Sequence, residues 1–170
     1  MILLFNMNLI ANQFCLRRQF KMHSILRGHY KNVLYIGNGA LISSKISNVF
    51  YGGNNGSCLK DSIYILSVYQ WCGIGSSIKL DLLQNQELNT LKIWFQDGDN
   101  RLYRIKIYII FDNKETQIYN DFTKSVFIIT FPQQMVSGFR ILNVAGNTYN
   151  SNLHFIKAEA YYKFQVNKLQ

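Results

Sequence analysis

The sequence predicts an antiparallel β-sandwich, because hydrophobic side chains recur at every second residue, with polar ones between them, over much of the chain. Between residues 103 and 111 the odd positions are Tyr, Ile, Ile, Ile and Phe, while Arg104 and Lys106 begin the other face. Glycine- and asparagine-rich turns separate segments of this kind. With 170 residues and 48% hydrophobic content, the chain is large enough for one domain with a core and is too apolar to be disordered.

Seven segments carry the strand pattern, and five turn clusters separate them. The predicted strands are residues 77–82, 88–95, 103–111, 116–119, 126–131, 139–144 and 154–164. The predicted turns are residues 51–57, 73–76, 97–100, 112–113 and 146–152, which are rich in Gly, Asn, Asp and Ser. The alternation in the last strand predicts that His154 shares its apolar face with Ile156 and Ala158.

The basic character of the chain lies in its first third. The net charge is +9, and residues 1–60 contain seven Lys or Arg and no acid. Such a segment is a solvated arm, a segment that binds an acidic protein or nucleic acid, or a targeting signal. Charge alone does not distinguish these alternatives. We expect an arm at residues 1–30, with residues 14–26 the one stretch that could form an amphipathic helix, a sandwich at 31–165 and a tail at 166–170. The residues of the arm expected to contact a partner are Phe14, Arg17, Arg18, Phe20, Lys21 and Arg27.

No arrangement of residues in the sequence predicts catalysis, a cofactor or a metal. There is no HExxH, no GxSxG and no glycine-rich phosphate loop before a helix. Cys15, Cys58 and Cys72 do not have zinc-finger spacing. Cys58 with Cys72 is the only plausible bridge, and three reduced thiols are the simpler interpretation. No apolar run approaches the roughly 20 residues of a membrane-spanning helix.

The densest polar cluster is the turn that contains Asp97, Asp99 and Arg101 and leads into Tyr103. Two acids beside a glycine are part of a calcium loop, but the remaining ligands are missing. We therefore expect a structural clamp, in which Arg101 pairs with one of the two acids and the carboxylates accept backbone N–H groups.

Residues 78–109, which read IKLDLLQNQELNTLKIWFQDGDNRLYRIKIYI, resemble the middle of a discoidin domain, the coagulation-factor type C sandwich. The closest similarity is to the intracellular variety that follows the BTB domain in certain BTB/POZ adaptor proteins. The turn residues Asp97, Asp99, Arg101 and Tyr103 match that family, as do DFTK at 121–124 and the ending with Asn147, His154 and Glu159, whereas Gln96 stands where the family usually has Trp. The resemblance covers residues 35–162 and implies a discoidin-like jelly roll in which His154, Asn147 and Glu159 are buried polar residues. For His154 we expect a neutral ring held by the 147–152 loop or by a backbone carbonyl.

Two functions follow as expectations. The first is a non-catalytic protein–protein interaction module that serves as a structural subunit of a large intracellular assembly, with an acidic surface such as tubulin as its partner. The cytoplasm or cytoskeleton, with a ciliary axoneme as one candidate, is its expected location, and a mitochondrial complex is the alternative. Nucleic acid is not an expected partner. The second function is a glycan- or phospholipid-binding module, as in the secreted discoidin domains.

Overall fold

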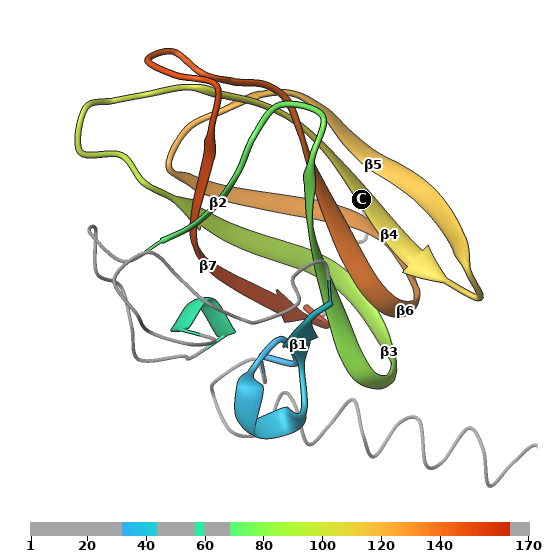
Figure 1. Cartoon of the computed structure of the whole chain (residues 1–170). Helices are drawn as coiled ribbons and strands as arrows, with labels where there is room; N and C mark the ends of the chain where they lie inside the picture. Colours follow the sequence, from blue (N-terminus) through green and yellow to red (C-terminus); the bar gives the residue numbers. More distant parts are fainter. Residues whose placement is uncertain (1–31, 44–56, 60–68, 164–170) are drawn as a thin grey trace, which may run out of the picture. The chain divides into compact units, whose positions relative to one another are not determined.

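The computed structural model of the chain describes residues 32–43, 57–59 and 69–163 (Figure 1). Contacts divide the chain into two compact units, residues 1–31 with 162–170 and residues 32–161. The predicted helix at 14–26 and the arm residues Phe14, Arg17, Arg18, Phe20, Lys21 and Arg27 lie outside the described residues. Within the described ranges, no helix is long and apolar enough to cross a membrane.

The described part is built almost entirely from β-strands, which confirms the all-β prediction. Two short 3₁₀ helices accompany them, η1 (Ile36–Asn38) and η2 (Ser57–Leu59). The strands are β1 (Leu41–Ile42), β2 (Gln70–Cys72), β3 (Ser77–Phe95), β4 (Tyr103–Phe111), β5 (Lys114–Thr123), β6 (Val126–Asn147) and β7 (Leu153–Tyr161). Their order is β2-β7-β3-β6-β4-β5, with β1 beside β3, and every pairing is antiparallel.

The two long strands β3 and β6 belong to both layers of the sandwich. The first half of β3 pairs with the second half of β6, which also pairs with β4, whereas the second half of β3 pairs with the first half of β6 and with β7. The β3–β6 register is interrupted between Asp81 and Gln86, where the strand pair bends from one layer into the other. The sequence predicted two separate strands in each case, because polar residues at both bends interrupt the hydrophobic alternation.

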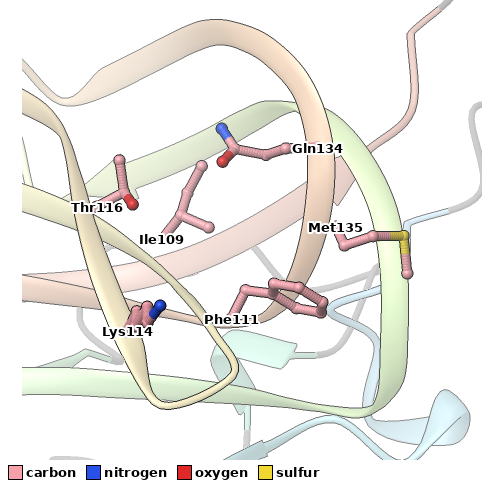
Figure 2. Close-up of a pocket in the computed structure, with 6 residues that line it drawn as sticks. All are labelled: Ile109, Phe111, Lys114, Thr116, Gln134 and Met135. Atoms are coloured by element: carbon pink, nitrogen blue, oxygen red, sulfur yellow. The ribbon is translucent and has the colours of Figure 1, made fainter.

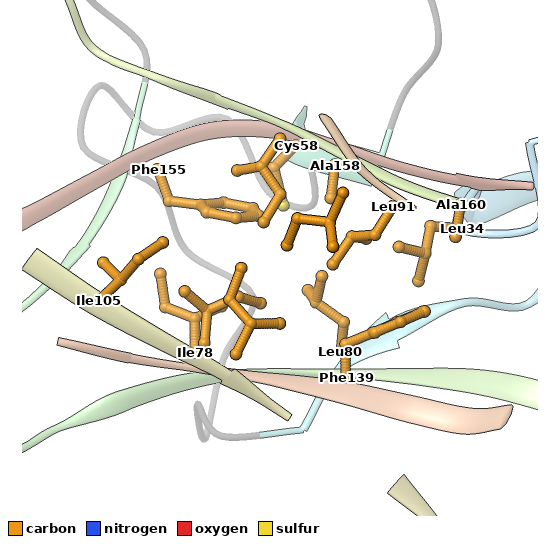
Figure 3. Close-up of a cluster of buried hydrophobic side chains, with 14 of the residues drawn as sticks. Leu34, Cys58, Ile78, Leu80, Leu91, Ile105, Phe139, Phe155, Ala158 and Ala160 are labelled. Atoms are coloured by element: carbon orange, nitrogen blue, oxygen red, sulfur yellow. The ribbon is translucent and has the colours of Figure 1, made fainter. Parts of the chain in front are cut away.

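The core lies between the two layers. In Figure 3, Phe155 and Ala158 of β7 face Ile78 of β3 and Phe139 of β6 across the core. Each of these four side chains is fully buried. The hydrophobic contacts across this space drive the folding of the sheets onto each other, because burial removes apolar surface from water.

A β-bulge in β7 overturns the predicted placement of His154. Trp94 pairs with Lys157 but the next residue, Phe95, pairs with Phe155, so Ile156 is an extra residue in β7. Phe155 therefore shares the core face with Ala158, and His154 lies on the opposite face, beside its partner Trp71 on β2. Simple alternation failed here because one extra residue shifts the alternation between the residues before it and those after it, so His154 and Ala158 lie on opposite faces.

Gly138 allows β3 and β6 to pack closely near the bend. A Cβ at this position would lie 2.6 Å from the backbone oxygen of Leu80 and 3.0 Å from Oδ1 of Asp81. We expect Gly138→Ala to lower the free energy of unfolding by about 1–3 kcal/mol, because the backbone of β3 must move away from its partner. Urea denaturation measures this loss. Gly73→Ala is the matched control, since a Cβ there meets no atom within 4 Å, and equal stability of the two variants would contradict this close approach.

Candidate binding site

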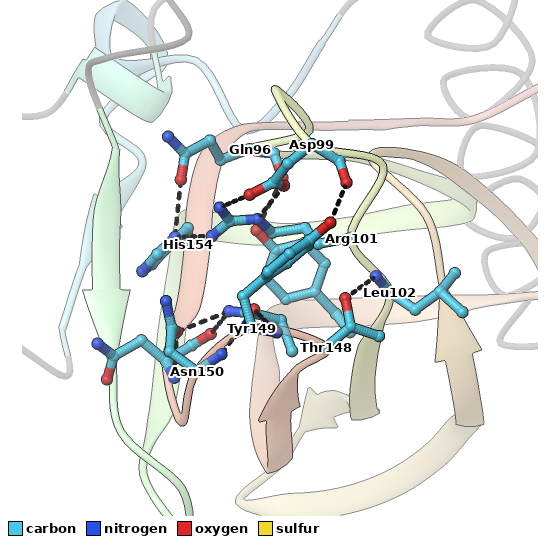
Figure 4. A network of polar contacts seen from close by, with 11 residues as sticks. Gln96, Asp99, Arg101, Leu102, Thr148, Tyr149, Asn150 and His154 are labelled. Carbon is cyan, nitrogen blue, oxygen red and sulfur yellow. Dashed lines mark hydrogen bonds and ion pairs between the residues drawn. The ribbon is translucent and has the colours of Figure 1, made fainter.

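Polar side chains from three parts of the chain meet at one end of the sandwich (Figure 4). The turn between β3 and β4 provides Gln96, Asp99 and Arg101, the loop between β6 and β7 provides Tyr149, and the start of β7 provides His154. The β3–β4 turn is thereby joined to a loop and a strand that follow it about 50 residues later.

Arg101 pairs with Asp99 of its own turn. Nε of Arg101 donates to Oδ1 of Asp99 at 2.6 Å, and Nη2 donates to Oδ2. Asn100 bends the chain between them with φ 56°, a left-handed conformation that asparagine tolerates. The guanidinium lowers the pKa of Asp99, chiefly through its hydrogen bonds, and the carboxylate raises the pKa of Arg101. The pair is therefore ionised at neutral pH.

The remaining nitrogen of Arg101 connects this turn to His154. Nη1 of Arg101 lies 2.8 Å from Nδ1 of His154. A guanidinium cannot accept a hydrogen bond, so Nδ1 is unprotonated and the ring proton is on Nε2. Burial lowers the pKa of His154 and the nearby positive charge of Arg101 lowers it further. The ring is therefore neutral at neutral pH.

Gln96 and Tyr69 hold the same imidazole ring from other directions. Oε1 of Gln96 lies 2.7 Å from the same Nδ1 (Figure 4). The one lone pair of Nδ1 accepts from Arg101, so Gln96 touches the ring without donating to it. Tyr69 stacks on the ring with 4.5 Å between centroids. His154 is thus buried and fixed, but by Gln96, Arg101 and Tyr69 rather than by the 147–152 loop or a backbone carbonyl.

Asn143 holds the loop between β6 and β7 in place. Its Nδ2 donates to the carbonyls of Cys72 and Ser151, at 2.9 Å each, and its Oδ1 accepts from the N–H of Gly146 at 2.6 Å. The side chain is completely buried, so these bonds replace its contacts with water. Gly146 itself has φ 74°, and a Cβ there would lie 2.4 Å from the oxygen of Asn150.

Two aromatic rings border the network and reach the solvent. Tyr149 is 63% exposed; its ring lies 5.4 Å from the guanidinium of Arg101, and its hydroxyl donates to the backbone oxygen of Asp99 at 2.9 Å. Trp71 is 47% exposed and is the β2 partner of His154 in the sheet. Side chains paired in this way point to the same face, so Trp71 lies next to the imidazole.

The structure brings together some of the residues predicted from the sequence and separates others. Arg101, Asp99 and His154 join in one network, while Tyr103 is buried under it and donates to the backbone oxygen of Gln96 at 2.8 Å. Burial raises the pKa of Tyr103 far above its usual value. Of the two acids in the turn, Asp99 forms the ion pair with the Arg101 guanidinium.

Asn147 and Glu159 are half-buried rather than buried, which corrects the prediction for both. Asn147 bonds within its own loop, where Nδ2 donates to the carbonyl of Asn152 at 2.6 Å. Glu159 pairs instead with Lys157 on the face of β7 away from the core. Both groups remain near water because their loop and sheet face lie at the surface.

Three participants were missed by the sequence analysis: Gln96, Tyr69 and Asn143. Gln96 was visible only as a departure from the discoidin pattern. Tyr69 carries no local signal because its partner His154 is distant in the sequence, and the bond of Asn143 to Cys72 spans 71 residues.

The described residues offer little chemistry for catalysis or metal binding. They contain no group of three or more His, Cys, Asp or Glu side chains that could hold a metal ion. Cys58 and Cys72 are buried free thiols, and burial raises the pKa of Cys58. A separate hollow of about 330 Å³ lies among side chains of β4, β5 and β6, with Lys114 as its one ionisable group (Figure 2). It is lined by Ile109, Phe111, Lys114, Thr116, Gln134 and Met135.

Solved structures share this fold, whereas no protein-family model and no curated protein sequence matches the chain. A family 32 carbohydrate-binding module from a family 31 glycoside hydrolase of Clostridium perfringens is 16% identical, with a TM-score of 0.60, over 78% of this chain and 98% of that one. The same kind of module of AlyQ, in complex with 4,5-unsaturated mannuronic acid, is 19% identical, with a TM-score of 0.55, over 79% and 98%. That of NanJ from C. perfringens, in complex with galactose, is 13% identical, with a TM-score of 0.55, over 72% and 91%.

These identities show the fold alone. They confirm the discoidin-like sandwich, since the modules have this galactose-binding-like architecture. The similarity to the intracellular variety of BTB/POZ adaptor proteins stays a prediction.

We expect Arg101→Ala to lower the melting temperature, because it leaves Asp99 and His154 without their shared partner. Arg101→Lys should lower it almost as much, since an ammonium group cannot reproduce the two parallel bonds to Asp99. Differential scanning calorimetry with and without calcium measures the effect. Wild-type protein should melt at the same temperature in both, and stabilisation by calcium would show that the turn is a metal loop.

His154 should make stability depend on pH. Its pKa in the folded state lies below the value of 6.5 that it has when exposed. The unfolded chain therefore binds the extra proton first, and stability is fully present above pH 6.5 and decreases as the pH falls below it. Denaturant titrations of wild type and His154→Gln should give a steeper loss for wild type as the pH is lowered. His154→Leu should be the less stable of the two variants at neutral pH, because leucine cannot bond to Arg101. Identical pH slopes for wild type and both variants would exclude a neutral ring.

Proposed function

We propose that this chain is a non-catalytic carbohydrate-binding module and that the sugar is held at the end of the sandwich formed by the β3–β4 turn and the β6–β7 loop. One observation carries the proposal: the exposed rings of Tyr149 and Trp71 border a fixed network of charged and polar groups. Tyr149 contacts Arg101, Arg101 bonds to His154, and Trp71 is the strand partner of His154.

A sugar ring has an apolar face of C–H groups and a rim of hydroxyls, and this site has a group for each. An exposed aromatic ring buries the apolar face without losing much conformational entropy, because it has only two rotatable side-chain bonds. Hydroxyls require donors and acceptors at fixed positions. Asp99 is about one-third exposed and can still accept, while the backbone of the two loops supplies further groups.

The network that holds these groups favours recognition. The side chain of Arg101 is 11% exposed. Its bonds to Asp99 and His154 fix the orientation of the guanidinium before any ligand binds. Preorganisation of this kind lowers the entropic cost of binding. The described residues near the site show no pairing of a nucleophile with a general base, which supports a binding role rather than a catalytic one.

The solved structures with this fold support the same class of ligand. One was solved with galactose and another with 4,5-unsaturated mannuronic acid. They favour the glycan-binding alternative over a subunit that docks on tubulin or another acidic protein. That interpretation, with its cytoskeletal, ciliary or mitochondrial location, stays a prediction because the arm lies outside the described residues.

A glycan array followed by titration calorimetry with the retained sugars tests the proposal. Wild type should retain one class of saccharide. Trp71→Ala and Tyr149→Ala should each weaken its binding by about tenfold or more, because the apolar face of the sugar loses a ring. Tyr149→Phe should keep most of the affinity, since the ring remains.

Phe122→Ala is the matched control, because Phe122 is an aromatic of 57% exposure on β5. It should bind as wild type does, and thermal melting should show all the variants folded. The proposed site would be overturned if wild type bound no saccharide on the array, or if it bound phospholipid vesicles instead. An equal loss of affinity in Phe122→Ala would overturn it as well.

A further inference from the structure

The first part of β6 is an edge strand of its layer. Val126 to Thr130 pair with β3 on one side, and no described strand pairs with them on the other. Pro132 follows in the same strand and lacks an N–H. Proline occurs at the edges of sheets because its missing N–H costs no hydrogen bond between strands there. The position of Pro132 therefore agrees with an edge on this side of β6.

The backbone groups at this edge can be assigned from one hydrogen bond. The N–H of Phe95 donates to the oxygen of Ser125 at 2.6 Å. In an antiparallel pair, alternate residues direct both backbone groups to the same neighbour. Phe127 and Ile129 therefore bond to β3, whereas Val126, Ile128 and Thr130 direct their N–H and C=O groups away from it.

The side chains on this edge are apolar and accessible. Val126 is 50% exposed and Ile128 is 57% exposed, on the face opposite the core. The segment from Val126 to Phe131 reads VFIITF and contains no charge. Soluble proteins usually protect such an edge with a charge, a proline, a bulge or a cover, because it is a template for pairing with another chain. Here Lys124 and Pro132 stand at the two ends of the segment and leave the residues between them open. An exposed edge of this composition indicates a partner strand.

We propose that two copies of this chain pair through this edge, antiparallel and about a two-fold axis at Ile128. In that register Ile128 lies opposite itself and Val126 lies opposite Thr130. The residues with outward backbone groups then bond to one another, and Pro132 lies just beyond the last of these pairs.

Charge distribution favours a second copy as the occupant. Each chain has a net charge of +9, so two copies repel each other over most of their surface. The segment from Val126 to Phe131 is uncharged and therefore places no like charges opposite each other in the pair. Lys124, exposed at the start of the edge, comes opposite Pro132 and next to Gln133 of the other copy. The side chain of Gln133 bonds to the carboxylate of Glu87, so one acid lies a single strand inward from the place that Lys124 of the other copy occupies. The edge is therefore complementary to itself.

The test uses sedimentation velocity of the full-length chain over a concentration series. Wild type should reach a dimer and no larger species, because two edges of this kind close on each other. Ile128→Lys should raise the dimer dissociation constant by about a hundredfold or more, since two ammonium groups face each other at the axis. An equimolar mixture of Ile128→Lys and Ile128→Glu should restore the dimer.

Leu83→Lys is the matched control, because Leu83 is 75% exposed at the β3 bend, away from this edge. It should dimerise as wild type does, and circular dichroism should show all variants folded. A wild type that stays monomeric, a dimer that Ile128→Lys leaves intact, or no rescue in the mixture overturns the proposal. A monomer that retains a foreign protein through the edge also overturns it.

Discussion

The antiparallel pairing of β3 with β6 is the interaction on which the rest of the structure depends. It runs from Ser77 opposite Leu142 to Trp94 opposite Val126, and it contributes a strand pair to each layer. Because the same two strands pass from one layer to the other, the layers cannot separate without breaking this ladder. The absence of a side chain at Gly138 allows the two backbones to approach closely near the bend.

The candidate site is supported by this scaffold through a small number of fully bonded polar groups. Asn143 on β6 joins the β6–β7 loop to β2, and Arg101 joins the β3–β4 turn to β7. A buried polar group without partners is costly, so a network in which each member bonds to the next has one low-energy arrangement. The exposed rings of Tyr149 and Trp71 are thereby kept at constant positions, which is what recognition of a small, rigid ligand requires.

The alternation in the sequence was sufficient to predict most strands, and the bounds of β4 agree with the prediction. The turn at 112–113 also agrees, since Asp112 and Asn113 both have positive φ. Alternation was insufficient where strands are irregular. It could not predict that β3 and β6 continue through their exposed bends, or that the bulge at Ile156 places His154 away from the core. A bulge changes which face a residue occupies without changing the composition around it.

The sequence by itself determined the all-β class, the discoidin-like turn and the pairing of opposite charges within it, because each depends on residues a few positions apart. The tertiary structure decided which side chains surround His154, and it placed Trp71 beside it. It also decided that Asn143 is the anchor of the β6–β7 loop and that one side of β6 remains an edge. Most of these relations join residues separated by tens of positions, and their geometry follows from the pairing of strands and from the bulge. Neither of these leaves a periodic signal along the chain.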